Sequence, residues 1–142
     1  MIPTLEEQIC FALYSASRAL TSRYRELLEP LGITYPQYLT LLVLWETGSA
    51  TVGTLGDRLH LDSGTLSPLL RRLEQAGLVT RSRQADDERV VHVSLTRAGA
   101  DLRSRAASVP EAICASTGLA LDDLVALRDQ VALVGESVRA SS

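Results

Sequence analysis

The chain has 142 residues, a formal net charge of −3, and 46% apolar but only 4% aromatic residues. This length fits one domain that buries about two-thirds of the surface its unfolded chain exposes. No run of about 18 apolar residues is present, which excludes a transmembrane helix, and the acidic start "MIPTLEEQ" lacks the features of a signal peptide. We therefore expect a cytoplasmic protein without membrane contact, whose core consists of aliphatic side chains on packed helices.

Potential metal ligands are few. The two cysteines lie 104 positions apart, and the two histidines, His60 and His92, have no ligand spacing to them. The sequence therefore predicts no structural metal and no cofactor. Two distant cysteines also fit a reducing compartment and no disulfide framework.

The first 46 residues predict two helices. Apolar residues at helical spacing indicate a long amphipathic helix over 5–28, which the proline and glycine of "EPLG" end. Thr34 then has the position of an N-cap, with Gln37 three residues later, and predicts a second helix over 35–46.

Two shorter helices are expected next. The segment "SATVGTLGDRLHL" predicts a short helix over 53–60, and Asp62 or Ser63 caps another over 64–75. Pro68 is disfavoured beyond a first helical turn, so it indicates that this fourth helix starts late.

The hydrophobic period then changes from helical to about two residues. "LVTRSR" and "RVVHVSL" predict two strands that flank the polar turn "QADDE". Thr96 caps a further helix from Arg97, which Pro110 kinks or ends; "STGLALDD" breaks the chain, and a last amphipathic helix covers 121–138. The expected fold is mainly α with one β-hairpin.

Charge is distributed unevenly along the chain. The segment from Ser63 to Arg105 carries a net charge of +3, whereas the remainder carries −6. A basic central segment between acidic ends is typical of a nucleic-acid-binding protein, although the net charge of the whole chain is −3.

A short helix, a tight turn and a helix opened by small polar residues form a helix-turn-helix pattern. Short hydroxyl side chains at the start of the second helix can reach base edges or phosphates, arginines on the next turns can reach phosphates or a guanine, and arginines on the hairpin suit the minor groove. The residues expected to contact double-stranded DNA are Ser63, Thr65, Ser67, Arg71, Arg72, Arg81, Arg83 and Arg89.

The segments "LTLLVLWETG" and "TVGTLGDRLHLDSGTLSPLLRRLEQAGLVTRSRQADDERVVHVSLTRAG" resemble the MarR family of dimeric winged-helix regulators, and "DDERVVHVSLTRAG" matches the wing signature of that family. The resemblance covers nearly the whole chain. It implies a winged helix-turn-helix over about 33–96, whose helix over 64–75 enters the major groove, with Arg89 at the wing tip and Asp87 orienting it. It also implies that 1–32 and 97–142 form a homodimer interface, and a two-fold dimer fits a pseudo-palindromic operator.

The residues alone leave two interpretations of Cys10, a packing residue or a reactive thiol. The segment around it, "EEQICFALYSASRALTSRYRELLEPLGITYPQYLTLLVLWE", resembles the organic-hydroperoxide-sensing, OhrR-type branch of the family. That resemblance implies that Cys10 is the sensing thiol and that the tyrosines that activate it correspond to Tyr24, Tyr35 and Tyr14.

Helix geometry decides which subunit can supply Tyr24. On one straight helix, Tyr24 lies on the same face as Cys10 but about 21 Å further along the axis. If its phenol hydrogen-bonds the sulfur, it must therefore come from the other subunit, as the resemblance also implies. Phenols that donate to sulfur, and a helix N-terminus nearby, favour the reactive thiolate.

Cys114, in "EAICASTG", is either a second packing residue or a resolving thiol. The OhrR-type group has one-Cys and two-Cys members, and a cysteine at this position resembles the resolving cysteine of the second kind. That resemblance implies that Cys10 is oxidised to a sulfenic acid and that Cys114 of the partner chain condenses with it to a disulfide.

The predicted function is a DNA-binding repressor that releases its operator when an organic hydroperoxide oxidises Cys10. The alternative is a MarR-type regulator controlled by a non-covalent small aromatic ligand, with Cys10 passive. A thiol peroxidase is disfavoured, because no cation or Thr/Pro active-site motif accompanies Cys10. A peroxidase would also leave the basic hairpin unexplained, so we expect no enzyme. The remaining alternative, a pure dimerisation module, predicts no salt-dependent DNA binding.

Overall fold

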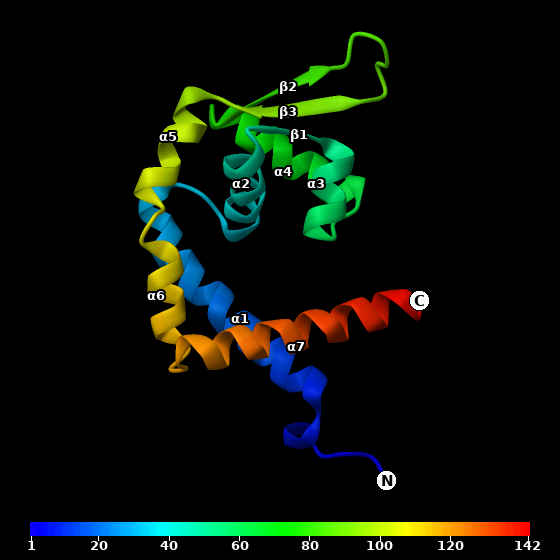
Figure 1. Ribbon diagram of the computed structural model, residues 1–142, viewed down its shortest axis with the longest axis vertical. Helices are drawn as coiled ribbons and strands as arrows, with labels where there is room; N and C mark the ends of the chain where they lie inside the picture. Colours follow the sequence, from blue (N-terminus) through cyan, green and yellow to red (C-terminus); the bar gives the residue numbers. More distant parts are fainter. The chain divides into compact units, whose positions relative to one another are not determined.

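The computed structural model describes residues 1–142, which form two compact units, Met1–Ala107 and Ser108–Ser142. The first unit contains η1 (Leu5–Glu7), α1 (Ile9–Leu28), η2 (Glu29–Leu31), α2 (Tyr35–Thr47), β1 (Ser49–Thr51), α3 (Val52–Leu59), α4 (Ser63–Gln75), β2 (Val79–Arg83), β3 (Val91–Leu95) and α5 (Arg97–Arg105) (Figure 1). The second unit contains α6 (Val109–Ser116) and α7 (Leu121–Ala140). The predicted fold class, mainly helical with a wing, is confirmed.

The helix predicted over 5–28 is divided into two pieces, so its predicted start was wrong. Residues 5–7 form a single 3₁₀ turn, because the backbone N–H of Thr4 donates to the Glu7 carboxylate at 2.9 Å. Gln8 is extended, with φ −86° and ψ 121°, and α1 begins only at Ile9. Cys10 is therefore the second residue of α1, closer to its N-terminus than the sequence predicted.

Local capping residues fix the starts of the next helices as predicted. Thr34 and Gln37 form the reciprocal capping box, in which the Gln37 side chain accepts from the Thr34 N–H at 2.9 Å. Asp62, the first of the two predicted caps, accepts from the Thr65 N–H at 2.7 Å. His60 adopts a left-handed conformation, with φ 55°, in the tight turn between α3 and α4.

Pro68 does not delay the start of α4, so this prediction was wrong. The helix begins at Ser63 and passes through Pro68 in its second turn. Proline removes the hydrogen bond to the carbonyl of Gly64. Gly64 is exposed near the helix start, where water can satisfy that carbonyl.

The sheet has one strand more than predicted. The two predicted strands are antiparallel, with Arg81 opposite Val93, and form the hairpin of the wing. Strand β1 pairs with β3 on its other side, so the order is β1-β3-β2 and β2 is an edge strand. Three residues are too few to show an alternating pattern, which is why β1 was not predicted.

The region after the wing differs in part from the prediction. Thr96 caps α5 as predicted, accepting from the Gly99 N–H at 3.1 Å. The helix ends at Arg105, and Pro110 lies in the first turn of a separate helix, α6, where proline is tolerated. Cys114 therefore lies within α6 and not in a break between helices.

The core of the first unit is aliphatic, as the composition predicted. Its fully buried side chains come from α1, α2, α3, α4 and the sheet, and include Leu28, Leu41, Leu44, Leu55, Leu66, Leu70, Leu73, Val79 and Val93. By contrast, α7 has no buried residue although it carries seven exposed large apolar side chains, and Leu28 is the only buried residue of α1. No helix is both long and apolar enough to cross a membrane.

Candidate sensing thiol and nucleic-acid interface

The outer face of α4 presents the polar residues that the sequence selected. Its inner face is fixed by four buried leucines, at 66, 69, 70 and 73. The predicted contact residues Ser63, Thr65, Ser67, Arg71 and Arg72 are all exposed. The Asp62 carboxylate that caps the helix has its pKa lowered, chiefly by the hydrogen bond from the Thr65 N–H. The start of α4 is thus firmly held while its hydroxyl groups face outward.

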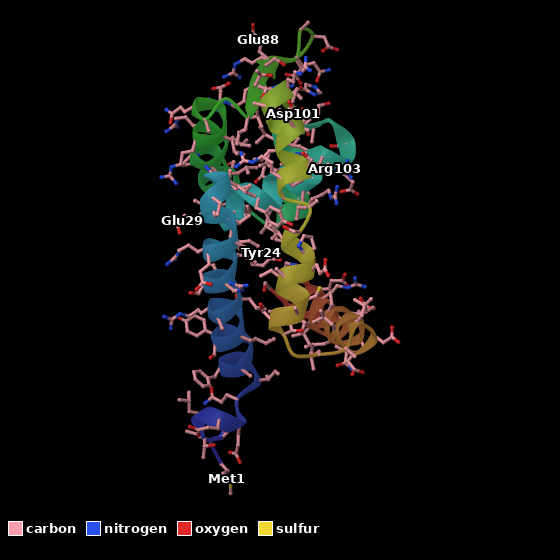
Figure 2. All side chains as sticks on the ribbon, turned by 90° about the vertical axis from the view of Figure 1, so that its left-hand side faces the viewer. Met1, Tyr24, Glu29, Glu88, Asp101 and Arg103 are labelled. Atoms are coloured by element: carbon pink, nitrogen blue, oxygen red, sulfur yellow. The ribbon has the colours of Figure 1, made fainter.

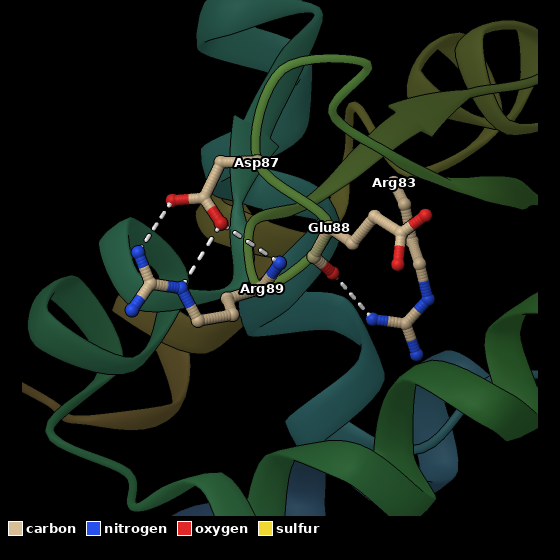
Figure 3. A network of polar contacts seen from close by, with 4 residues as sticks. All are labelled: Arg83, Asp87, Glu88 and Arg89. Carbon is tan, nitrogen blue, oxygen red and sulfur yellow. Dashed lines mark hydrogen bonds and ion pairs between the residues drawn. The ribbon is translucent and has the colours of Figure 1, made fainter.

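Two hydrogen-bonded contacts order the wing tip (Figure 3). The Arg89 guanidinium donates to both oxygens of Asp87, at 3.1 and 3.3 Å, and its backbone N–H donates to the same carboxylate at 3.0 Å. The pKa of Asp87 is lowered, chiefly by the hydrogen bonds from the Arg89 side chain. The Arg83 guanidinium donates to the Glu88 carbonyl at 2.6 Å. The orientation of Arg89 by Asp87 is therefore present, and the Arg89 side chain stays 90% exposed.

One hollow joins the start of α4 to the wing. It has a volume of about 560 Å³, and its lining includes Ser63 and Ser67 of α4 together with Arg81, Arg83 and Arg89 of the hairpin. Residues predicted separately from a helix and from a hairpin thus surround a common space that three arginines line. Arginine and hydroxyl side chains are the groups that commonly contact DNA phosphates.

Arg81 has a partner within the protein. Its guanidinium donates to Glu74 Oε1 from two nitrogens, at 3.0 and 3.3 Å, and its backbone N–H donates to Glu74 Oε2 at 3.1 Å. This pairing lowers the pKa of Glu74, chiefly through the hydrogen bonds from the Arg81 side chain. DNA contact by Arg81 stays an untested prediction, and Glu74 is a residue that sequence reasoning missed.

Cys10 is exposed in the first turn of α1. Its sequence neighbours Ile9 and Phe11 are also exposed, to 65% and 37%, and Tyr14 to 62%. A helix N-terminus stabilises negative charge, because its N–H groups point out of the helix without partners. The environment of the sulfur in a single chain is therefore an accessible apolar surface at the positive end of a helix.

Two of the three predicted tyrosines lie together. The rings of Tyr24, on α1, and Tyr35, at the start of α2, are stacked with centroids 4.2 Å apart. Burial raises the pKa of Tyr35, so its phenol stays protonated at neutral pH and can donate a hydrogen bond. Figure 2 shows Tyr24 on α1 far from Met1, toward the end of the helix that joins α2.

Tyr14 is separate from this pair. It is exposed on α1 and carries the Arg18 guanidinium over its ring, 5.5 Å from the centroid. Because α1 is continuous from Ile9 to Leu28, Tyr24 lies about 21 Å along the axis from Cys10. The structure therefore brings Tyr24 and Tyr35 together but leaves Cys10 of the same chain distant from Tyr24.

The tyrosine pair continues into a row of aromatic residues that the sequence analysis did not identify. Tyr38 lies 5.8 Å from Tyr24, and Trp45 lies 6.1 Å from Tyr38 in an edge-on arrangement. The Trp45 indole donates to the Gly99 carbonyl at 2.8 Å. The spacing of three between Tyr35 and Tyr38 on one helix was the available sequence signal.

A second hollow, of about 510 Å³, lies beside Tyr35. Thr21 and Arg25 of α1, Glu29 of η2 and residues 32–36, which lead into α2, line it. It is large enough to receive a small molecule or a side chain of another subunit.

Cys114 is partly exposed in α6, which belongs to the second unit. No group of three His, Cys, Asp or Glu side chains is placed to hold a metal ion.

Comparison with known proteins identifies the family. The MarR family model matches residues 33–91. The organic hydroperoxide resistance transcriptional regulator of Bacillus subtilis is 50% identical over 124 residues, which span 87% of this chain and 84% of that protein. The chain belongs to the MarR family. Its predicted membership is confirmed, and the chain is a transcriptional regulator of the MarR type, as expected, and not an enzyme.

Solved structures of other MarR-family regulators have the same fold. The structure of reduced AbfR bound to DNA superposes with a TM-score of 0.79 at 38% identity, covering 94% of each chain. The structure of disulfide-formed AbfR superposes with a TM-score of 0.67 at 38% identity, covering 92% of this chain and 91% of that one. AbfR is a protein of Staphylococcus epidermidis.

Proposed function

We propose that this regulator binds double-stranded DNA as a homodimer and releases it when an organic hydroperoxide oxidises Cys10. The observation that carries the proposal is an exposed cysteine in the first turn of α1, distant from the stacked tyrosines Tyr24 and Tyr35 on its own chain. Such an arrangement becomes a complete site only when a second subunit brings the two halves together.

The DNA-binding part of the proposal covers about 33–96 and uses the basic hollow between α4 and the wing. The hydroxyl groups of Ser63, Thr65 and Ser67 read the major groove, while Arg83 and Arg89 enter the minor groove. Arg71 and Arg72 contact phosphates. The DNA-bound AbfR structure supports this use of the fold, and binding to DNA places the protein in the cytoplasm.

The dimer interface of the proposal consists of 1–32 and 97–142. Exposed large apolar side chains are concentrated in 1–14 and 119–138, with Leu42 alone between them. Exposed apolar side chains concentrated in this way, in each of the two units, mark contacts with another chain. A two-fold dimer that buries them presents two copies of α4 to the two halves of a pseudo-palindromic operator.

The sensing chemistry needs no metal or cofactor. The Cys10 thiolate attacks the terminal oxygen of the hydroperoxide, the O–O bond breaks, and the products are a Cys10 sulfenic acid and an alkoxide that takes a proton to become the alcohol. Tyr24 and Tyr35 of the partner subunit donate hydrogen bonds to the thiolate. Tyr14 is the third phenol proposed to activate the thiolate, and the apolar side chains of Ile9, Phe11 and Leu13 favour organic peroxides.

In the second step, the thiol of the partner's Cys114 condenses with the sulfenic acid, forming a disulfide and releasing water. The named relative from Bacillus subtilis supports an organic hydroperoxide as the inducer, and the disulfide form of AbfR supports disulfide formation in a protein of this fold.

The test compares DNA release by wild type, Cys10→Ser and Cys114→Ser after one equivalent of cumene hydroperoxide. We expect wild type to release DNA and to give a disulfide-linked dimer on a non-reducing gel, and both serine variants to give no such dimer. Release by Cys10→Ser equal to that of wild type would disprove oxidation of Cys10 as the signal.

A second candidate function is favoured by the hollow beside Tyr35. A small phenolic or aromatic ligand could bind there without covalent chemistry and release the DNA, with Cys10 passive. Release of DNA from Cys10→Ser by such a ligand, together with insensitivity of wild type to the peroxide, would identify this alternative.

A further inference from the structure

We propose that Glu74 is a positioning residue for DNA binding, which holds the wing at a fixed angle to α4 by binding Arg81. The proposal rests on the DNA-binding function proposed above. It assigns Glu74 a role although its negative charge lies beside a surface that has to bind phosphates.

The contact joins the two elements that are expected to enter neighbouring grooves of DNA. Glu74 lies in the last turn of α4 and Arg81 is the central residue of β2. All three hydrogen bonds of this contact are directed to one carboxylate, two from the guanidinium and one from the main chain. The two guanidinium nitrogens share Oε1 and the main-chain N–H binds Oε2, so both carboxylate oxygens are engaged and the contact fixes orientation as well as distance.

The edge position of β2 explains why the main chain takes part. Only one side of β2 is paired, with β3, because β2 is the edge strand. No strand lies on the other side of β2 to accept the Arg81 N–H. This N–H donates to the Glu74 carboxylate instead, at 3.1 Å. Glu74 replaces a neighbouring strand at this point, so its removal leaves the Arg81 N–H without this acceptor and removes a polar contact between the wing and α4 that supplements the buried packing of Val79.

The length of the hairpin amplifies any change at this contact. Strand β2 continues two residues beyond Arg81, to Arg83, which is about 7 Å at 3.3 Å per residue, and the turn at 84–90 follows. A tilt of the hairpin around Arg81 therefore moves the wing tip further than it moves the contact itself. In Figure 2 the Glu88 label marks this tip at the far end of the first unit.

If Arg81 contacts DNA directly, Glu74→Gln should change DNA affinity in the opposite direction from the one that a positioning role predicts. Glu74→Gln removes a negative charge from a DNA-binding surface, so electrostatics alone predicts tighter binding, and more so if it frees Arg81 for a phosphate. A positioning role predicts weaker DNA binding, because the wing is no longer held at a fixed angle to α4. The pair is 31% exposed at Arg81 and 38% exposed at Glu74, so we expect a moderate loss, about tenfold.

The experiment measures affinity for a duplex that the wild-type protein selects from a random-sequence pool. Glu74→Gln should bind about tenfold more weakly. Its hydroxyl-radical footprint should lose the minor-groove protection at the wings and keep the protection at the major-groove half-sites. Glu88→Gln is the matched control, because it removes the same charge from the wing tip, where Glu88 contributes only its carbonyl to the contact with Arg83; it should bind as tightly as wild type or more tightly.

The double variant Glu74→Gln/Arg81→Gln should bind no more weakly than Glu74→Gln, because the two residues act through one contact. A further loss in the double variant, or equal or tighter binding by Glu74→Gln, would overturn the proposal. Glutamine near a helix C-terminus is well tolerated, and circular dichroism checks the fold.

Hydrogen exchange keeps the contact testable without DNA. The Arg81 amide should exchange faster in Glu74→Gln than in wild type, and unchanged protection would overturn the positioning role. If the wild-type protein selects no duplex from the pool, the proposed function fails, whereas a failure of the Glu74 proposal alone leaves wild-type binding intact.

Discussion

Replacement of Gly99 by alanine tests the junction between the wing and α5. A Cβ atom at this position would collide with the Leu78 carbonyl oxygen and would lie 3.1 Å from the Leu78 carbonyl carbon and from Leu95 Cδ2. The same carbonyl oxygen of Leu78 accepts the Thr96 N–H at 3.0 Å, and the Gly99 carbonyl accepts the Trp45 indole. The start of α5 therefore cannot move away from β2 without loss of hydrogen bonds.

The expected loss of stability follows from these contacts. Overpacking costs about 1–3 kcal/mol and each lost hydrogen bond about 1 kcal/mol, whereas alanine in a helix gains up to about 1 kcal/mol over glycine. We expect the free energy of unfolding to fall by about 3 kcal/mol, which corresponds to a decrease of about 10 °C in Tm for a chain of this size.

Differential scanning calorimetry at a fixed protein concentration measures the effect, because the Tm of a dimer depends on concentration. Gly53→Ala is the matched control: a Cβ there would meet only Thr51 Oγ1 at 3.8 Å, an ordinary contact, so its Tm should stay the same or rise. A Gly99→Ala protein as stable as Gly53→Ala would refute the close packing of α5 against β2.

Three further predictions concern the interface, the phenols and the wing. Val134→Glu places a charge on the face of α7 where exposed apolar residues recur at 127, 131, 134 and 138, and should shift the protein to a monomer in sedimentation experiments. Ala126→Glu, with the same added charge on the side of α7 that carries Asp122 and Asp129, should remain a dimer. Tyr35→Phe keeps the stacked ring but removes the hydroxyl, so oxidation of Cys10 by cumene hydroperoxide should slow about tenfold with DNA affinity unchanged; an unchanged rate would exclude a hydrogen bond to the sulfur. The Asp87 carboxyl should titrate below 3.8 by NMR, because Arg89 lowers its pKa. Its contact therefore stabilises the wing above the unfolded pKa and is lost as pH falls through the folded pKa, and titration at or above 3.8 would contradict the contact.

Features that depend on a few neighbouring residues were predictable from sequence. Thr34 with Gln37 and Asp62 with Thr65 form caps over three residues, so their types and spacing determine where α2 and α4 begin. The hairpin was predictable for the same reason, because a period of two is visible in five residues of each strand.

The features that sequence did not reveal depend on contacts across the fold. Propensity alone delays a helix at Pro68, but the buried leucines on both sides hold α4 in place. Composition shows Arg81 only as a positive charge, whereas the fold pairs it with Glu74 inside the protein. The hydrogen bond from the Trp45 indole to the Gly99 carbonyl joins residues 54 positions apart.

Mixed dimers test most directly whether Cys10 is activated by the phenols of the other subunit. One dimer pairs a Cys10→Ser protomer with a Tyr24→Phe/Tyr35→Phe protomer, so the remaining Cys10 faces intact tyrosines only across the interface. The other pairs wild type with a protomer that carries all three substitutions, so the remaining Cys10 has intact tyrosines only on its own chain. We predict rapid oxidation by cumene hydroperoxide in the first dimer and slow oxidation in the second, and the reverse order would contradict activation across the dimer.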